Sequence, residues 1–185
     1  MTIADFDFWV SDMQELIELP RRARLRLTEN GLTITPASQA HKATQTELAN
    51  QIGDKLPGWQ WLSQFSVVPP REGYKPEPDV SAVRAEDFDP AASEACEDRL
   101  PFVVEIVAKE SRERHHETKP AHYALRGIPA YLVVDVRRAT WTLYQEPNEA
   151  KYQRVTEGEF GEEIVIPVDG EPMLRLDSSK FRRFV

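Results

Sequence analysis

Cysteine is nearly missing from this sequence, which contains only Cys96, and one cysteine excludes an internal disulfide. A chain without disulfides is typical of a reducing compartment, so we expect a cytoplasmic protein. The single thiol lies in an acidic stretch, Glu94-Ala95-Cys96-Glu97-Asp98, which should raise its pKa. Cys96 is therefore a poor candidate for a nucleophile.

Long apolar runs are missing too. No stretch approaches the roughly 20 apolar residues that a membrane-spanning helix needs. The first residues, Met1-Thr2-Ile3-Ala4-Asp5, show no basic region followed by an apolar one. We therefore expect neither a membrane protein nor a signal peptide.

Basic residues are outnumbered, with 23 Lys and Arg against 31 Asp and Glu, a net charge of −8. This balance argues against broad, non-specific binding of nucleic acid but leaves room for a local basic surface. The 185 residues are 41% hydrophobic and 29% charged, without repeats or low-complexity tracts. They predict one globular domain over residues 1–185.

Apolar periodicity and turn residues predict alternating helices and strands. A helix is expected over residues 11–19, before a hairpin of residues 23–27 and 32–35 around Asn30-Gly31. The further expected helices cover residues 39–56 and 120–126. The further expected strands cover residues 59–68, 79–83, 102–107, 131–136, 140–145, 152–156 and 164–168, with a solvated excursion over 84–99 and an ambiguous tail from Leu174. This order predicts an α/β or α+β fold with a mixed central sheet.

The most apolar of these strands, Phe102–Val107, is interrupted by one carboxylate, that of Glu105. A buried ionised side chain is costly unless it is paired or bound to a metal, so Glu105 needs a partner. Asp79 begins a neighbouring candidate strand, and the two acids could share a magnesium ion, with the Ile106 carbonyl and waters completing its shell. Equally, Asp79 could cap a turn after Pro78 while Glu105 pairs with a Lys or Arg. The residues leave both interpretations open.

Two lysines and one histidine are further candidates for this site. A lysine beside a metal can orient the attacking water or offset charge on a phosphate, and Lys109 and Lys119 both follow the strand of Glu105. Lys119 is favoured because it lies at the start of a helix. His41 falls in the first turn of the helix over residues 39–56, where a surface or capping role is more common than catalysis. Asp135 ends a strand, where a turn role is the better interpretation.

The segments around these residues resemble one family. These segments are Lys75-Pro76-Glu77-Pro78-Asp79-Val80, Val103-Val104-Glu105-Ile106-Val107, and the block from Lys119-Pro120-Ala121-His122-Tyr123 to Val133-Val134-Asp135. They are similar to the Uma family, restriction-endonuclease-like proteins of the PD-(D/E)XK nuclease superfamily. The resemblance implies a restriction-endonuclease-like mixed sheet flanked by helices, with an N-terminal helix and β-hairpin. It also implies a magnesium-dependent phosphodiester hydrolase, with manganese as an alternative metal, that acts on DNA as a homodimer.

The resemblance also assigns roles to residues. Asp79 and Glu105 match the family's two acids, Lys119 matches a helix lysine that replaces the one missing at Val107, and His41 matches a helix histidine. By this likeness the catalytic residues are Asp79, Glu105, Lys119 and His41, and the metal ligands are Asp79, Glu105 and Ile106.

The chain departs from the family pattern at two further places. Ala108-Lys109-Glu110-Ser111 stands where Ser-Pro-Ser is usual, and Leu27 stands where the first hairpin strand usually carries a Glu. We therefore expect a metal-dependent DNA endonuclease. The alternative is a catalytically impaired binding or dimerisation module, which Leu27 and the net charge favour. A hydrolase of small phosphodiesters is a weaker third hypothesis.

Overall fold

The computed structural model describes residues 23–28, 31–36, 39–63, 65–69, 75–107, 118–168 and 173–183. The chain divides into two units, Met1–Ser38 and Gln39–Val185, which are described separately. The predictions for residues 11–19 and for Lys109 lie outside the described residues. Among the described residues, no helix is long and apolar enough to cross a membrane.

The first unit contains the predicted hairpin. Strands β1 (Ala23–Thr28) and β2 (Gly31–Pro36) pair antiparallel, from Thr28 opposite Gly31 to Ala23 opposite Pro36. Leu27 lies in β1, opposite Leu32 of β2. The sequence had placed the same two strands on either side of Asn30, so the hairpin prediction is confirmed.

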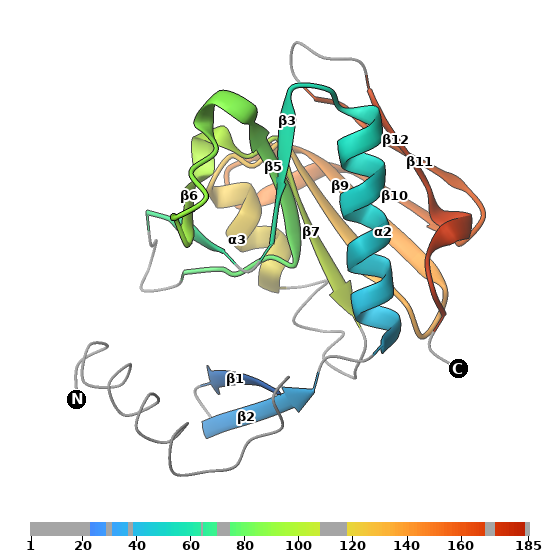
Figure 1. Ribbon diagram of the computed structural model, residues 1–185, viewed down its shortest axis with the longest axis horizontal. Helices are drawn as coiled ribbons and strands as arrows, with labels where there is room; N and C mark the ends of the chain where they lie inside the picture. Colours follow the sequence, from blue (N-terminus) through green and yellow to red (C-terminus); the bar gives the residue numbers. More distant parts are fainter. Residues whose placement is uncertain are drawn as a thin grey trace. The chain divides into compact units, whose positions relative to one another are not determined.

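The second unit is built on a six-stranded mixed sheet, in the order β10-β9-β8-β7-β5-β3 (Figure 1). Its strands are β3 (Trp59–Leu62), β5 (Val80–Arg84), β7 (Phe102–Val107), β8 (Ala130–Asp135), β9 (Thr140–Asn148) and β10 (Lys151–Glu159). Among the described strands of this sheet, only β7 and β8 pair in parallel, and all twelve of their residues are buried. The α/β class and the mixed central sheet are therefore confirmed.

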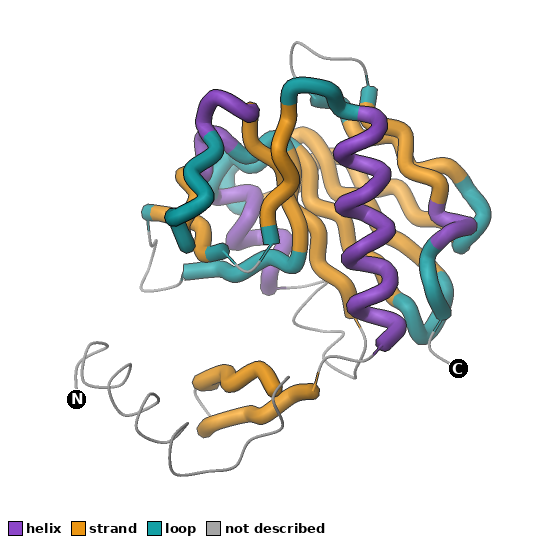
Figure 2. The backbone as a smooth tube through the Cα atoms, in the orientation of Figure 1, coloured by secondary structure: helices purple, strands orange, loops and turns teal. Residues whose placement is uncertain are grey.

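Two layers cover the sheet (Figure 2). Helix α2 (Gln39–Lys55) and the pair β11 (Glu163–Ile166) and β12 (Leu174–Asp177) share one apolar core with the sheet. Helix α3 (Lys119–Leu125), β4 (Ser66–Val68) and β6 (Glu94–Cys96) belong to the core on the other face. Side chains along β7 alternate between the apolar cores on the two faces of the sheet. Val104 and Ile106 lie in the core shared with α2, and Val103 and Val107 lie in the core shared with α3.

One local prediction was wrong and a second holds in part. The single strand expected over residues 59–68 is two strands, because β3 pairs with β5 in the central sheet while β4 pairs in parallel with β6. The solvated excursion expected over residues 84–99 is exposed over residues 85–94, but it also contains β6 and two short 3-10 helices, η1 (Ala85–Asp87) and η2 (Glu97–Arg99). Glu97 in this segment is buried and lies 3.7 Å from the guanidinium of Arg126. Pairing with distant partners, which periodicity does not reveal, decides both outcomes.

Candidate active site

The two acids that the sequence singled out lie on adjacent strands at one end of the sheet. Asp79 directly precedes β5, and Glu105 lies in β7, which pairs with β5. Both residues are nearly inaccessible to solvent, with 3% of Asp79 and 2% of Glu105 exposed. Asp79 contacts the backbone of Ile106, the residue next to Glu105, and its negative charge contributes to a raised pKa of Glu105.

Asp79 is held by two elements. Its Oδ2 accepts a hydrogen bond from the backbone N–H of Ile106 in β7 at 2.8 Å, and the Nε2 of His41 in α2 lies 3.1 Å from the same oxygen. Gln45, one turn after His41, donates its Nε2 hydrogen to the Asp79 carbonyl at 2.8 Å. The carboxylate of Asp79 therefore joins the start of α2 to the carboxyl end of β7.

Glu105 has its partners in α3, which covers the face of the sheet opposite to α2. The Nζ of Lys119 lies 2.5 Å from Glu105 Oε1, and the Tyr123 hydroxyl donates to the same oxygen at 2.9 Å. Burial is the largest cause of the raised pKa of Glu105, and both the charge and the hydrogen bonds of α3 act against it. The structure thus supplies the partner that a buried glutamate needs, and it is Lys119.

The sequence of α3 explains how two side chains reach one carboxylate oxygen. Lys119 and Tyr123 are four residues apart, so they lie one above the other on the same helix face. Pro120 occupies the first turn, where its missing N–H costs no hydrogen bond, and Gly127 ends the segment at φ +69°. The predicted helix start at Lys119-Pro120 is therefore the feature that positions the lysine.

Ile106, proposed from the sequence as a carbonyl ligand, contacts Asp79 through its backbone N–H. The N–H and C=O of a strand residue leave the same side of the strand, because a hydrogen-bonded pair exchanges both bonds with one partner. Since the Ile106 N–H points to Asp79, its carbonyl faces the same side of β7. The Asp79 carboxylate and the Ile106 carbonyl therefore lie on the same side of β7, and Ile106 directly follows Glu105 in the chain.

The remaining sequence candidates have structural roles. Asp135 accepts hydrogen bonds on Oδ1 from the N–H groups of Arg137 and Arg138, each at 3.0 Å, and so fixes the turn after β8, as the turn interpretation predicted. A hydrogen bond to Asp98 is the largest cause of the raised pKa of the Cys96 thiol, which agrees with its dismissal as a nucleophile.

Gln45 is a site residue that the sequence analysis missed. Helical spacing had placed Tyr123 on one face with Lys119, as a surface that could bind phosphate, but had not paired it with Glu105. Gln45 lies four residues after His41, so the same spacing would have found it.

We predict that Tyr123→Phe lowers the free energy of unfolding by about 1.5–3 kcal/mol, because a buried charged acceptor loses one of its donors. The same change should raise the pKa of Glu105 further, since the Tyr123 hydroxyl opposes the shift. Urea unfolding measures the first effect. Tyr152→Phe is the matched control, because its hydroxyl donates to the Ile128 carbonyl at 2.8 Å and does not involve Glu105. A Tyr123→Phe protein as stable as the wild type would contradict the prediction.

A cavity of about 400 Å³ lies elsewhere in the second unit, between β3 and residues 87–99. Trp61, Phe88 and Cys96 are among its lining residues, and none of the four candidate catalytic residues is. This cavity therefore gives no support to a confined small-substrate pocket at the site.

Comparisons with known proteins show the family and the fold of the chain. The family model named Uma2, described as "Putative restriction endonuclease", matches residues 11–177. The chain belongs to the Uma2 family. The resemblance noted in the sequence is thereby confirmed over most of the chain, and membership of the Uma2 family supports a nuclease.

One solved structure is similar to this chain in its fold. It is titled as a "putative nuclease belonging to DUF820" from Anabaena variabilis, and it is 16% identical to this chain. The match covers 91% of this chain and 96% of the other, with a TM-score of 0.61. The comparison with curated proteins found no match. At this identity the structural likeness shows a shared fold.

Proposed function

We propose that this protein is a metal-dependent endonuclease that hydrolyses phosphodiester bonds in DNA at Asp79, Glu105 and Lys119. The observation that carries the proposal is the pair of interacting buried carboxylates with a buried lysine 2.5 Å from one of them. Buried carboxylates in close proximity repel each other, and a divalent cation relieves that repulsion. Family membership supports the nuclease reaction, and DNA is the substrate that the resemblance implies.

The donor set fits magnesium. Within the described residues, no group of three or more His, Cys, Asp or Glu side chains is arranged to hold a metal ion. Magnesium does not need such a group, because it is usually bound by one or two carboxylates together with waters and substrate phosphates. Asp79 and Glu105 would supply the carboxylates and Ile106 the carbonyl, and each carboxylate can bind with one oxygen while the other accepts hydrogen bonds. When bound, the metal would polarise the scissile phosphate and lower the pKa of a water.

Lys119 has a double role in this proposal. Its ammonium stabilises the ionised form of Glu105, which is the form that binds a cation. An ammonium at this place can also hold the attacking water or offset the negative charge that develops on the phosphate. The Lys119 ammonium must be held at one position to contact both Glu105 and the water or phosphate. Helix α3 holds it there.

His41 acts through Asp79. Its imidazole contacts Oδ2, the same atom that accepts the hydrogen bond from the Ile106 N–H. We infer that His41 is a positioning residue that fixes the orientation of the Asp79 carboxylate, as orienting partners do for metal ligands generally. The alternative role for His41 is a direct contact with the substrate.

We predict that the purified protein nicks or linearises supercoiled plasmid DNA in millimolar magnesium or manganese and loses this activity in EDTA. Agarose gel electrophoresis of the plasmid forms measures the reaction. The control is an Asp79→Asn protein purified in parallel, which separates this activity from a contaminating nuclease. No cleavage by the wild type with either metal, on supercoiled or linear DNA, would contradict the proposal and favour the impaired module. Sedimentation equilibrium tests the expected homodimer separately.

A further inference from the structure

Exposed basic side chains surround the candidate site although the chain as a whole is acidic. We refer to five of them as the basic rim, and all five are exposed in the structure: Lys42, Arg137, Arg138, Arg182 and Arg183. They come from three segments that are far apart in the sequence. The folded chain carries each segment to the end of the sheet where Asp79 and Glu105 lie.

Arg137 and Arg138 follow the strand beside Glu105. β8 runs parallel to β7, with Val133 opposite Glu105 and Asp135 opposite Val107. The two arginines form the turn directly after Asp135, and the next link back to β7 is the hydrogen bond from Val136 N–H to the Val107 carbonyl at 3.2 Å. At about 3.3 Å per strand residue, this turn lies on the order of 10 Å beyond Glu105.

Arg182 and Arg183 reach the same end of the sheet along α2. The Arg182 N–H donates to Thr44 Oγ1 at 3.2 Å, and Thr44 is three residues, or about 4.5 Å of helix, after His41. Phe181 anchors this segment, because it is 4% exposed and packs edge-on against Phe160 at a ring distance of 5.5 Å. Lys42 lies beside His41 in the first turn of α2.

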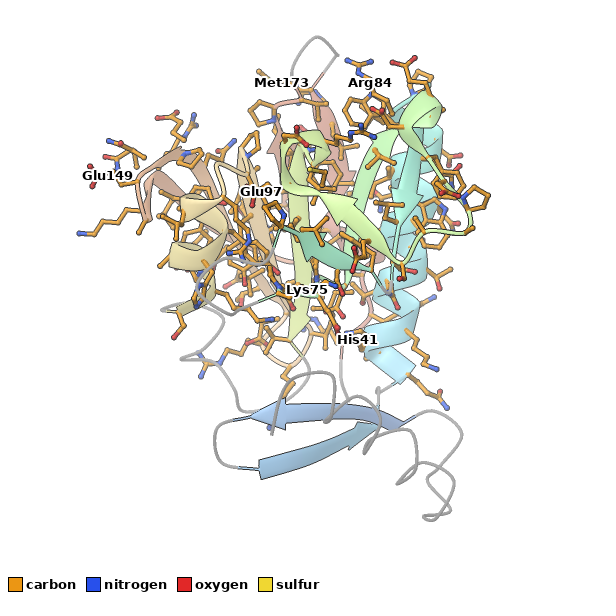
Figure 3. The ribbon with its side chains drawn as sticks, turned by 90° about the vertical axis from the view of Figure 1, so that its left-hand side faces the viewer. His41, Lys75, Arg84, Glu97, Glu149 and Met173 are labelled. Atoms are coloured by element: carbon orange, nitrogen blue, oxygen red, sulfur yellow. The ribbon has the colours of Figure 1, made fainter. Side chains whose placement is uncertain are left out.

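The segments of the rim are joined through the β10–β11 connection. Phe160 N–H donates to the Ala139 carbonyl at 2.8 Å, and Gly161 N–H donates to Ser178 Oγ at 2.9 Å. The turn of Arg137 and Arg138 is thereby linked to the segment that carries Arg182. Figure 3 shows His41 at one end of the second unit, with Arg84 and Met173 at the other. The basic rim therefore belongs to the end that carries the site.

Among the described residues, the exposed acidic side chains near this end include Glu77, two residues before Asp79, and Glu159 and Glu162 in the β10–β11 connection. The Glu162 Oε1 accepts a hydrogen bond from the Glu159 N–H at 3.3 Å. Asp135 is buried and fixes its own turn, and Arg138 Nε lies 3.9 Å from it with the arginine side chain 53% exposed. An exposed pair of this kind is weak, so Arg138 keeps its capacity to bind another anion.

We propose that the basic rim binds the phosphate backbone of duplex DNA on both sides of the bond that is cleaved. This inference rests on the proposed function, because it assigns a polymeric substrate to the same site. A basic surface that extends on the order of 10 Å from the carboxylates spans several base pairs at 3.4 Å each, whereas a small phosphodiester would not reach it. Arginine and lysine contacts to phosphates position a protein on DNA without reading its sequence.

Metal-free binding tests the rim without any cleavage. The probe is a fluorescent 20-base-pair duplex in EDTA, and anisotropy gives the dissociation constant at a series of salt concentrations. We expect Arg137→Glu/Arg138→Glu and Arg182→Glu/Arg183→Glu each to weaken binding at least tenfold. Each double variant should also reduce the slope of log K against log salt by about 2, since each phosphate contact contributes about 0.9.

The matched control is Lys151→Glu/Arg154→Glu. Both residues are exposed on β10, and Arg154 pairs with Gln145, which pairs with Ala130 at the opposite end of β8. The control changes the net charge equally and should bind like the wild type or nearly so. Rim variants that bind no worse than this control would overturn the inference, as would a wild type that hydrolyses a small phosphodiester yet does not bind the duplex. Rim-dependent binding by a protein without hydrolytic activity would support the rim and contradict only the proposed function.

Discussion

Replacing Lys119 with Met is expected to lower the free energy of unfolding by about 3–5 kcal/mol at about pH 8. The change leaves Glu105 buried without its cation, and removal of one partner from a buried pair has this magnitude. Both side chains are almost fully enclosed, with 3% and 2% exposed, so water does not replace the ammonium. Urea denaturation measures the effect.

The pH dependence of this loss follows from the direction of the Glu105 shift. The pKa of Glu105 is raised above 4.5 in the folded protein, so the folded state binds this proton more tightly than the unfolded chain does. The stability contributed by the neutral form is fully present below 4.5 and is lost as the pH rises through the folded pKa. Lys119 opposes the shift, so its removal extends the loss to higher pH. The stability difference between Lys119→Met and the wild type should therefore be small at about pH 4 and grow toward about pH 8.

Two controls define this experiment. Glu105→Gln/Lys119→Met removes both charges and should recover much of the lost stability, with little remaining pH dependence of the difference. Lys151→Met replaces an exposed lysine and should change stability by no more than about 0.5 kcal/mol. The buried pair would be energetically unimportant if Lys119→Met and Lys151→Met were equally stable at both pH values.

The second large effect concerns catalysis. Asp79→Asn and Glu105→Gln should each reduce metal-dependent cleavage of DNA by at least about 10³-fold, because metal-assisted charge stabilisation supplies several kcal/mol and each 1.36 kcal/mol is a factor of ten. Plasmid cleavage rates, measured over a range of enzyme concentrations, give this number. Both substitutions keep the size of the side chain, so folding of each variant can be confirmed by its urea transition.

Asp135→Asn is the matched control for these two variants. Asp135 is also a buried carboxylate near the end of a central strand, and its hydrogen bonds go to the turn that follows. An asparagine can accept the same bonds, so cleavage should stay close to wild type. A loss of activity in Asp135→Asn equal to that in Asp79→Asn would show that the end of the sheet, rather than the pair of acids, is what the reaction needs.

Local patterns were sufficient for the elements that carry the site. The apolar strand Phe102–Val107, the helix that begins near Lys119 and the helix of His41 were all predicted within a few residues. An isolated Glu in an apolar strand predicted a charged partner, since an unpaired buried carboxylate is too costly. The pairing of Glu105 with Lys119 follows from this cost together with helix position.

Contacts between distant segments were not accessible in the same way. Nothing local to residues 59–68 shows that Trp59–Leu62 joins the central sheet while Ser66–Val68 pairs with Glu94–Cys96. The basic rim was equally hidden, because Arg137 and Arg182 are 45 positions apart in the sequence and their segments are linked in the fold through the β10–β11 connection. The significance of Leu27 in β1 stays a prediction.

Metal binding by the wild type and by the two carboxylate variants decides whether Asp79 and Glu105 form a metal site. Isothermal titration calorimetry with magnesium and with manganese would be performed on the protein alone and with inorganic phosphate as a stand-in for the substrate. We predict that the wild type binds in at least one of these conditions and that Asp79→Asn and Glu105→Gln abolish the binding. Wild-type binding that both variants retain, or no binding by the wild type in any of the four conditions, would contradict a metal site at Asp79 and Glu105.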